Sequence, residues 1–124
     1  MKNIAVVLSG CGVRDGSEIH EATLLLLAID KLGAKYTIFA PNTDFKAYNH
    51  YTGNDTDEKR NILAESARIA RGDIKDLITF DATEYDALIF PGGFGAAKNL
   101  CTYAIDGVNM EVRKDVAQAI VDMH

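Results

Sequence analysis

The sequence predicts an α/β fold in which helices cover a mostly parallel β-sheet. Two observations lead to this prediction. Residues 3–40 contain a β-branched apolar run, a stretch with helical apolar spacing and a second apolar run, which is the pattern of a right-handed strand–helix–strand unit. The four consecutive apolar residues from Ala87 to Phe90 are too few for a helix and are typical of a strand that is covered on both faces.

The N-terminal unit is the first element in chain order. A β-branched run predicts a strand from Asn3 to Leu8, of the kind found in the middle of a parallel sheet. Asp15 and Glu18 form a capping-box pattern, which predicts that a helix from Ser17 to Leu32 follows the loop. A glycine ends this helix, and the second strand is expected from Tyr36 to Ala40.

The first helix has a wider apolar stripe than one sheet face needs. Leu24 and Leu27 lie outside the set of residues that faces the sheet. We therefore expect part of this helix to pack against something else, and a second subunit is one candidate.

The rest of the chain predicts a series of shorter elements. Polar, turn-rich sequence over 41–57 indicates a loop or a hairpin, and Asp55 with Glu58 forms a second capping-box pattern before the second helix. The elements expected from there on are a helix from Ile62 to Ala70, a short strand from Leu77 to Phe80, a helical turn capped by Asp81, a central strand from Ala87 to Phe90, a short helix from Ala96 to Cys101 and a last helix that begins at Asn109.

Composition limits the classes of function. The 124 residues suit one domain, and the formal net charge of −5 with no basic cluster gives no electrostatic footprint for nucleic acid or an acidic membrane. Cys11 and Cys101 form no CxxC pair and have no histidine-rich surroundings, so neither a disulfide framework nor a zinc site is predicted. A small molecule or another protein is the expected partner.

The N-terminus resembles a lipoprotein signal only superficially. Five apolar residues, Ile4 to Leu8, precede Ser9, whereas the apolar region of a secretory signal has about 7–15 residues. No other segment approaches the about 18 apolar residues of a membrane span. We therefore expect a cytoplasmic protein that does not bind a membrane.

The glycine-rich turn after the central strand is the main candidate for a binding site. Gly92, Gly93 and Gly95 allow positive φ angles and leave the backbone N–H groups uncovered, so that these groups can face a ligand. Binding of an anion or an oxyanion is the functional interpretation. A tight strand-to-helix turn that binds nothing is the alternative.

The N-terminal glycines do not fit a dinucleotide-binding site. The spacing Gly10-x-Gly12-x-x-x-Gly16 is one residue longer than GxGxxG, and Asp15 places a carboxylate where a pyrophosphate would lie. No acidic residue follows the second strand to hold a ribose hydroxyl. The sequence thus predicts no cofactor and no metal site.

Four blocks of sequence occur in an order and register that match a known family along the whole chain. The blocks are Ser9-Gly10-Cys11-Gly12-x-x-Asp15-Gly16-Ser17-Glu18-Ile19-His20-Glu21, Phe39-Ala40-Pro41, Glu65-Ser66-Ala67-Arg68-Ile69-Ala70-Arg71-Gly72 and Phe90-Pro91-Gly92-Gly93-Phe94-Gly95-Ala96-Ala97-Lys98-Asn99-Leu100. They resemble the enhancing-lycopene-biosynthesis (ElbB-type) branch of the ThiJ/PfpI superfamily, which is associated with isoprenoid biosynthesis. The resemblance implies a class I glutamine amidotransferase-like domain with a flavodoxin-like three-layer sandwich, of which residues 1–124 would be the N-terminal part. It also implies a homodimer and glyoxalase III-like lyase activity on small α-oxoaldehydes, described for some members.

The resemblance further implies a site with three parts: a cysteine nucleophile at a strand-to-helix elbow, a glutamate of the first helix, and amides of the Pro-Gly-Gly turn. Glu21 matches the glutamate, and Gly93, with Gly92 or Phe94 beside it, matches the turn. A thiolate would attack a carbonyl, the carboxyl group would shuttle the proton and the amides would stabilise the oxyanion. The family's nucleophile cysteine follows one further strand, and the chain ends at His124 before it. We therefore expect an incomplete domain that is inactive on its own.

Neither cysteine of the chain is a clear substitute for this nucleophile. Cys11 precedes the first helix, whose dipole would lower a thiol pKa, so a reactive role stays open beside a packing role. Cys101 follows a short helical stretch, where the dipole disfavours a thiolate. Gly12 and His50 complete the candidate substrate-binding set, and His50 is expected to reach the rim of the pocket.

Two functions from different classes remain open. The first is a cysteine-dependent enzyme that acts on a small aldehyde, with the chain forming a homodimer or lacking its C-terminal half. The second is a non-catalytic module in which the glycine-rich turn binds a small anion and the leucine-rich first helix binds a protein.

Overall fold

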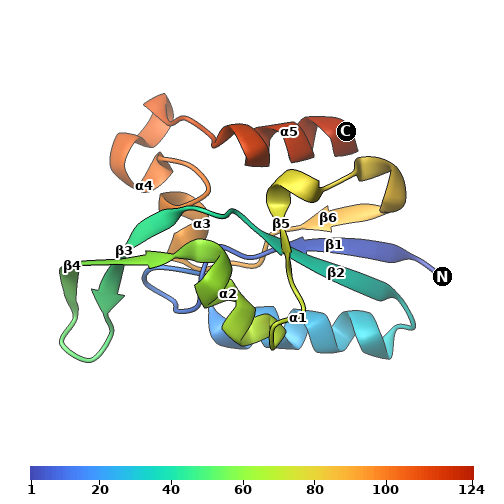
Figure 1. Cartoon of the computed structure of the whole chain (residues 1–124), viewed down its shortest axis with the longest axis horizontal. Coiled ribbons are helices and arrows are strands. Elements are labelled where there is room, and N and C mark those ends of the chain that lie inside the picture. The colour runs from blue at the N-terminus through green and yellow to red at the C-terminus, as the bar shows by residue number, and fades with distance from the viewer.

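The computed structural model describes all 124 residues and shows an α/β fold in three layers (Figure 1). A four-stranded parallel sheet has the order β5-β2-β1-β6. Helices α1 (Ile19–Lys31) and α2 (Ile62–Ala70) cover one face of this sheet, and α5 (Lys114–Met123) covers the other. The predicted flavodoxin-like sandwich with a mostly parallel sheet is confirmed.

The middle of the sheet is the predicted strand–helix–strand unit. Strands β1 (Asn3–Val7) and β2 (Lys35–Ala40) pair in parallel over five residues, from Asn3 opposite Lys35 to Val7 opposite Phe39. Residues Ala5–Val7 and Ile38–Ala40 are buried on both faces, as is expected of the middle of a parallel sheet.

Helix α1 uses a different cap from the one predicted. The carboxylate of Glu18 accepts the N–H of Glu21 at 2.8 Å, which satisfies the first turn and lowers the pKa of Glu18. Asp15 does not cap the helix; it is 6% exposed and accepts the N–H of Tyr48 at 2.7 Å. The capping-box prediction was therefore wrong, because a donor from a distant strand occupies the Asp15 carboxylate.

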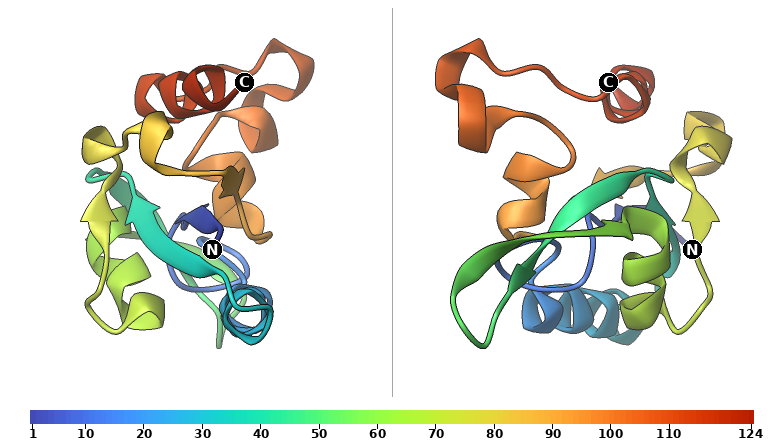
Figure 2. Two further views of the ribbon diagram at one scale, coloured as in Figure 1. Left: turned by 90° about the vertical axis from the view of Figure 1, so that its right-hand side faces the viewer. Right: turned by 60° about the vertical axis from the view of Figure 1, so that its left-hand side comes forward.

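The polar stretch after β2 is a hairpin rather than a loop. Strands β3 (Asp44–Asn49) and β4 (Asn54–Asn61) pair antiparallel in a sheet of their own, and Figure 2 shows the hairpin extending away from the main sheet. The predicted cap at Asp55 and Glu58 was wrong, because both residues lie in β4. The N-cap of α2 is Asn61, whose side chain accepts the N–H of the third helical residue at 2.8 Å.

The strand predicted from Leu77 to Phe80 is mostly a turn. Strand β5 is only Lys75–Asp76, and the 3₁₀ turn η1 (Leu77–Thr79) follows it. The carboxylate of Asp76 accepts a backbone N–H within this turn and so ends the strand. The side chain of Leu77 still enters the core.

The strand before the Pro-Gly-Gly turn lies at the edge of the sheet. β6 (Ala87–Ile89) follows the 3₁₀ turn η2 (Ala82–Glu84), which Asp81 caps as predicted, and it pairs with β1 alone. Its residues are half-buried. The prediction of a strand is confirmed, but the prediction of a central strand covered on both faces was wrong, because an apolar run does not specify the neighbours of a strand.

The C-terminal quarter begins with short helices. The predicted helix from Ala96 is α3 (Phe94–Lys98), which starts directly after the Pro-Gly-Gly turn. α4 (Tyr103–Asp106) and η3 (Gly107–Asn109) follow. The prediction that Asn109 begins the last helix was wrong, because Asn109 ends a 3₁₀ turn. That helix, α5, begins later because the chain is still extended after η3.

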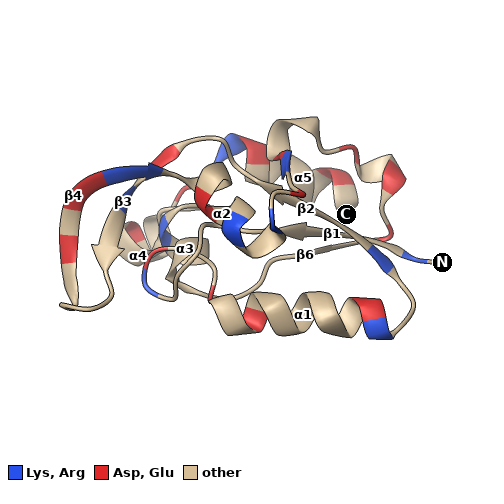
Figure 3. Cartoon of the chain, turned by 60° about the horizontal axis from the view of Figure 1, so that its bottom comes forward, with Lys and Arg blue, Asp and Glu red and all other residues tan.

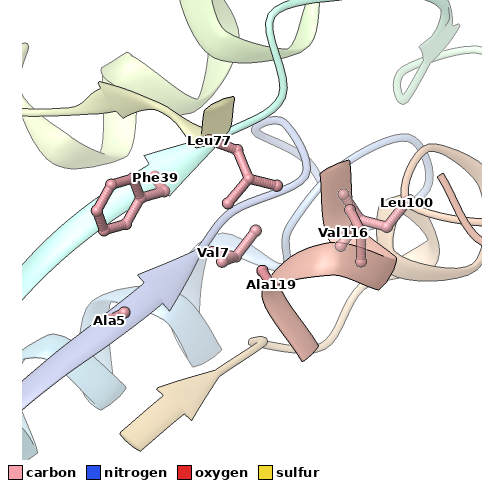
Figure 4. Packing of buried hydrophobic residues seen from close by; sticks show 7 residues of the cluster. All are labelled: Ala5, Val7, Phe39, Leu77, Leu100, Val116 and Ala119. Atoms are coloured by element: carbon pink, nitrogen blue, oxygen red, sulfur yellow. The ribbon is translucent and has the colours of Figure 1, made fainter. Parts of the chain in front are cut away.

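The core on the α5 side of the sheet holds β1, β2, η1 and α5 together (Figure 4). Phe39 packs edge-on against Phe80 and Tyr85, with ring centroids 5.4 and 5.7 Å apart. The buried members are Ala5, Val7, Phe39, Leu77, Leu100, Val116 and Ala119.

We predict that the 124-residue chain self-associates. The outer edge of β6 is unpaired, and Leu24 and Leu27 of α1 are 62% and 51% exposed on a helix whose only charges lie near its two ends (Figure 3). Sedimentation velocity over a range of concentrations tests this expectation. A monodisperse monomer at high concentration would contradict it.

We predict that Gly95→Ala lowers the free energy of unfolding by about 3 kcal/mol, the upper end of overpacking costs. A Cβ at this buried position collides with the Cα of Gly16 and the Oγ of Ser9, and a backbone atom cannot move aside. Urea unfolding followed by circular dichroism measures the change. Gly33→Ala is the control: its Cβ meets nothing within 4 Å, and only its positive φ is costly, by about 1 kcal/mol. Equal stability of Gly95→Ala and the native chain would refute the close approach.

Candidate functional site

The candidate site lies beyond the carboxyl ends of the sheet strands, where the hairpin and α3 also lie (Figure 1). One half of it is the glycine loop, residues 9–18, which ends at the N-cap of α1. Buried serines shape this loop from inside: Ser9 donates its N–H to Oγ of Ser17, and Gly10 donates its N–H to Oγ of Ser66, both at 2.9 Å. Because these donors are buried, the two hydroxyl groups replace water as partners of the loop backbone.

Asn99, just after α3, fastens the two ends of the glycine loop. Its amide nitrogen donates to the carbonyl oxygens of Ser9 at 2.8 Å and Asp15 at 2.7 Å. One side chain thus holds both ends of the loop at a fixed separation. Removing it would leave two part-buried carbonyl groups without a partner.

The other half of the site is the Pro-Gly-Gly turn, residues 91–95, and it is bonded to the glycine loop along its length. No side chain takes part, so the two backbones approach as closely as strands do. The bonds run from the N–H of Glu18 to the carbonyl of Gly92 at 2.8 Å, from the N–H of Phe94 to the carbonyl of Val13 at 2.8 Å and from the N–H of Gly95 to the carbonyl of Gly16 at 2.9 Å.

The structure brings Glu21 to this turn, although some 70 residues separate them. Glu21 lies in the first turn of α1, and its carboxyl group covers Gly92 so closely that a Cβ added to Gly92 would collide with Oε2 of Glu21. The parallel topology explains this proximity, because the ends of neighbouring parallel strands meet at one edge of the sheet. The catalytic role of Glu21 stays a prediction.

Two backbone donors of the turn have no partner within the chain. The N–H groups of Gly92 and Gly93 donate no hydrogen bond, whereas the N–H of Phe94 donates to Val13. Gly93 has a φ of 122°, and a Cβ there would collide with the backbone of the glycine loop. Gly93 with Gly92, and not the amide of Phe94, therefore forms the free donor pair.

Cys11 lies half-buried in the glycine loop, against α2. Burial raises the pKa of its thiol, Glu65 and Asp15 raise it further, and only Arg68 opposes them. The expected lowering by the helix dipole was wrong, because loss of hydration and two carboxylates outweigh it. Cys11 is a thiol rather than a thiolate at neutral pH.

His50 lies against the glycine loop and connects the hairpin to it. Nε2 accepts the N–H of Arg14 at 3.2 Å, and Nδ1 lies 3.1 Å from the carbonyl oxygen of Tyr48. Because Nε2 accepts this N–H, Nδ1 is the nitrogen placed to donate to the Tyr48 carbonyl oxygen. Gly12 lies against the imidazole ring of His50, and a Cβ added to Gly12 would be 2.8 Å from that ring. The substrate-binding roles of Gly12 and His50 stay predictions.

A cleft of about 890 Å³ lies between the hairpin and the segment from α3 to α5, and neither Glu21 nor the two free amides line it. Cys101 does line it, with its thiol donating to the carbonyl oxygen of Ala96 at 3.4 Å. Because Glu21 and the two free amides lie elsewhere, we place the candidate site at Glu21 and not in this cleft.

Four residues of the site were not found by sequence reasoning. Ser66, Asn99 and Tyr48 act through tertiary hydrogen bonds to the glycine loop, which no local spacing reveals. The sequence did carry a signal for Arg14, because it is the one long cationic side chain in the glycine loop. Ser66 and Asn99 belong to the quoted blocks, which was the available signal for them.

No family model matches the chain. The chain is 50% identical over 123 residues to "Glutamine amidotransferase-like class 1 domain-containing protein 3, mitochondrial" of Homo sapiens, covering 98% of this chain and 46% of that protein. It is also 50% identical, with the same coverage, to the "ES1 protein homolog, mitochondrial" of Rattus norvegicus, and 40% identical over 128 residues to the "ES1 protein, mitochondrial" of Danio rerio, of which it covers 47%. The chain spans about half the length of these curated relatives.

Two solved structures are similar. The isoprenoid biosynthesis protein with amidotransferase-like domain from Ehrlichia chaffeensis superposes with a TM-score of 0.91 at 40% identity, over 97% of this chain and 57% of that one. The Rapid Encystment Protein 24 KDa of Francisella tularensis gives a TM-score of 0.54 at 19% identity, over 99% of this chain and 54% of that one. The second likeness shows the fold alone.

The fold, the glycine-rich site and these likenesses define a class I glutamine amidotransferase-like α/β protein. These likenesses confirm the resemblance to the ElbB-type branch that the four sequence blocks carry.

The predicted cytoplasmic localisation was wrong, because three curated relatives are named as mitochondrial proteins. The prediction depended on the lack of a secretory apolar region, but mitochondrial targeting segments are amphipathic and arginine-rich, so that test does not detect them. No helix of the structure combines the length and the apolar character needed to cross a membrane.

We predict that Cys11 reacts slowly with iodoacetamide at pH 7. Its raised thiol pKa leaves less thiolate at neutral pH than an ordinary cysteine has, and the rate should increase with pH up to a midpoint above the ordinary value of 9.0. The Cys101→Ser variant, which keeps Cys11 alone, is followed by mass spectrometry beside free cysteine. Fast alkylation at pH 7 would contradict the prediction and make Cys11 a candidate nucleophile again.

Proposed function

We propose that the chain supplies two of the three elements of a cysteine-dependent, glyoxalase III-like site that acts on small α-oxoaldehydes. The observation that supports this proposal is the contact between the Glu21 carboxyl group and Gly92, beside the two unpartnered amides of Gly92 and Gly93. A carboxyl group next to two free donors suits a reaction in which a proton moves while negative charge develops on an oxygen. Residues 1–124 are then part of a single domain.

In this proposal a cysteine outside the chain provides the thiolate. Its sulfur adds to the aldehyde carbon, and the π electrons of the carbonyl move to oxygen. The N–H groups of Gly93 and Gly92 stabilise this oxyanion, a contribution of about 2.7–4 kcal/mol per donor in other enzymes. Glu21 accepts the thiol proton as the thiolate forms and gives it to the alkoxide oxygen after the attack, so that a neutral hemithioacetal results.

The chain alone is inactive in this proposal. The raised pKa of Cys11 argues against an internal substitute for the nucleophile, and Cys101 lines a different cleft. By analogy with the names of its relatives, we also propose a mitochondrial location and an association with isoprenoid biosynthesis. We further propose that the protein forms a homodimer in which the exposed leucines of α1, Leu24 and Leu27, lie at the interface.

A non-catalytic module is the second candidate. The free amides of Gly92 and Gly93 would bind a small anion, and the exposed Leu24 and Leu27 would bind a protein. The presence of a carboxylate directly over Gly92 disfavours anion binding at that position, so the enzyme is our first choice.

The test is Glu21→Gln, made at the aligned position of the full-length human relative, with methylglyoxal as substrate. We expect kcat/KM to fall by about 10²–10⁴-fold with an unchanged Tm, because an exposed carboxyl group is lost and no core contact changes. Glu18→Gln is the matched control: this residue caps α1, so its loss should lower Tm more than turnover. Unchanged turnover of Glu21→Gln would refute the assignment.

A second variant tests the geometry of the same site. Gly92→Ala places a methyl group where Oε2 of Glu21 lies, and the flexible glutamate must swing away. Turnover should therefore fall while stability changes little. If no full-length relative turns over methylglyoxal, the non-catalytic candidate is preferred.

A further inference from the structure

The guanidinium group of Arg14 makes cation–π contacts with two aromatic rings. Its central carbon lies 4.7 Å from the ring centroid of Tyr48 in the hairpin and 5.0 Å from that of Phe94 in α3. Its backbone is fixed as well: its N–H donates to Nε2 of His50, and its carbonyl oxygen accepts from Nζ of Lys98 at 3.4 Å. Cation–π contacts of this kind orient a guanidinium plane before any ligand arrives.

This cation has no anionic partner within the chain. Arg14 takes part in none of the ion pairs, and its side chain donates no hydrogen bond, although acidic residues outnumber basic ones by 18 to 13. The neighbouring Asp15 carboxylate is buried and accepts the N–H of Tyr48 instead. The two cation–π contacts use none of the N–H donors of the guanidinium, which therefore stay available.

Arg14 lies beside the turn that carries the free amides. The N–H of Phe94 donates to Val13, the residue before Arg14, and Phe94 directly follows Gly93. The Arg14 guanidinium and the unpartnered Gly93 amide therefore flank the same Phe94 residue, whose side chain is half-exposed.

We propose that Arg14 binds the carboxylate or phosphate group of a small ligand whose carbonyl oxygen lies at the Gly93 amide. This inference rests on the proposed function and narrows its substrate class to carbonyl compounds that carry an oxyanion. A planar guanidinium binds such groups through paired, charge-assisted hydrogen bonds. The carboxylates of Glu18 and Glu21 repel an anion near Gly92, so the charged end of the ligand lies on the Arg14 side.

Two matched pairs of probes test the proposal by NMR titration of the ¹⁵N-labelled chain. Glyoxylate and methylglyoxal share an aldehyde, and only glyoxylate has a carboxylate; glyceraldehyde 3-phosphate and glyceraldehyde differ by a phosphate. At least one charged probe should bind about tenfold more tightly than its neutral partner, with shifts at the Arg14 Nε–H and the Phe94 amide. Which pair shows the difference identifies the oxyanion.

Substitution separates recognition from a purely structural role. Arg14→Met keeps an apolar chain against the two rings and should abolish the preference for the charged probe, whereas Arg14→Lys should retain part of it. Arg71→Met, at an exposed arginine that ends α2, is the matched control and should leave binding unchanged. Thermal melting of each variant reports any loss of packing.

Equal affinities within both pairs would overturn the proposal. So would an Arg14→Met variant that lowers Tm and leaves the preference intact, since Arg14 would then only connect the hairpin to α3. The experiment measures binding to this chain and needs no turnover. A negative Glu21→Gln result would therefore not contradict anion binding by Arg14, and a lack of anion binding by Arg14 would not contradict the role of Glu21.

Discussion

Three main-chain hydrogen bonds hold the glycine loop against the Pro-Gly-Gly turn, and the site depends on them. They need an approach that no side chain permits: a Cβ at Gly93 or Gly95 would collide with the backbone of the glycine loop, and a Cβ at Gly16 would collide with Gly10 and Cys11 inside that loop. Because α1 starts at the end of the loop, this contact also sets the distance from Glu21 to the free amides. The glycines thus determine the geometry, and the polar residues are placed by it.

Sequence reasoning succeeded where the signal is local. Apolar runs predicted β1 and β2, and helical spacing predicted α2, because in each case the signal lies within the residues of the element itself. It failed where a distant partner decides. Asp15 has the spacing of a cap, but the Tyr48 N–H, which belongs to a strand 33 residues away, takes its carboxylate. β6 has the composition of a buried strand, but its position at the edge follows from pairings that no local pattern contains.

The same division applies to the site. The proximity of Glu21 and Gly92 could be predicted, because parallel topology alone brings strand ends together. The electrostatics of Cys11 could not. Burial raises its pKa, and the charges of Glu65 and Arg68, which act in opposite directions, come from α2, whose contact with the loop no local pattern reveals.

Tyr48 shows why the hairpin belongs to the site rather than to the periphery. Its N–H donates to the buried Asp15 carboxylate, its carbonyl oxygen lies 3.1 Å from Nδ1 of His50, and its ring makes a cation–π contact with Arg14. The main-chain contacts would persist with another side chain, whereas the cation–π contact requires an aromatic ring. The main chain of Tyr48 therefore positions the hairpin, and the side chain of the same residue orients Arg14. A displacement of the hairpin would release the Asp15 carboxylate, the His50 ring and the Arg14 guanidinium together, which makes the charge pattern around the glycine loop a property of the tertiary fold.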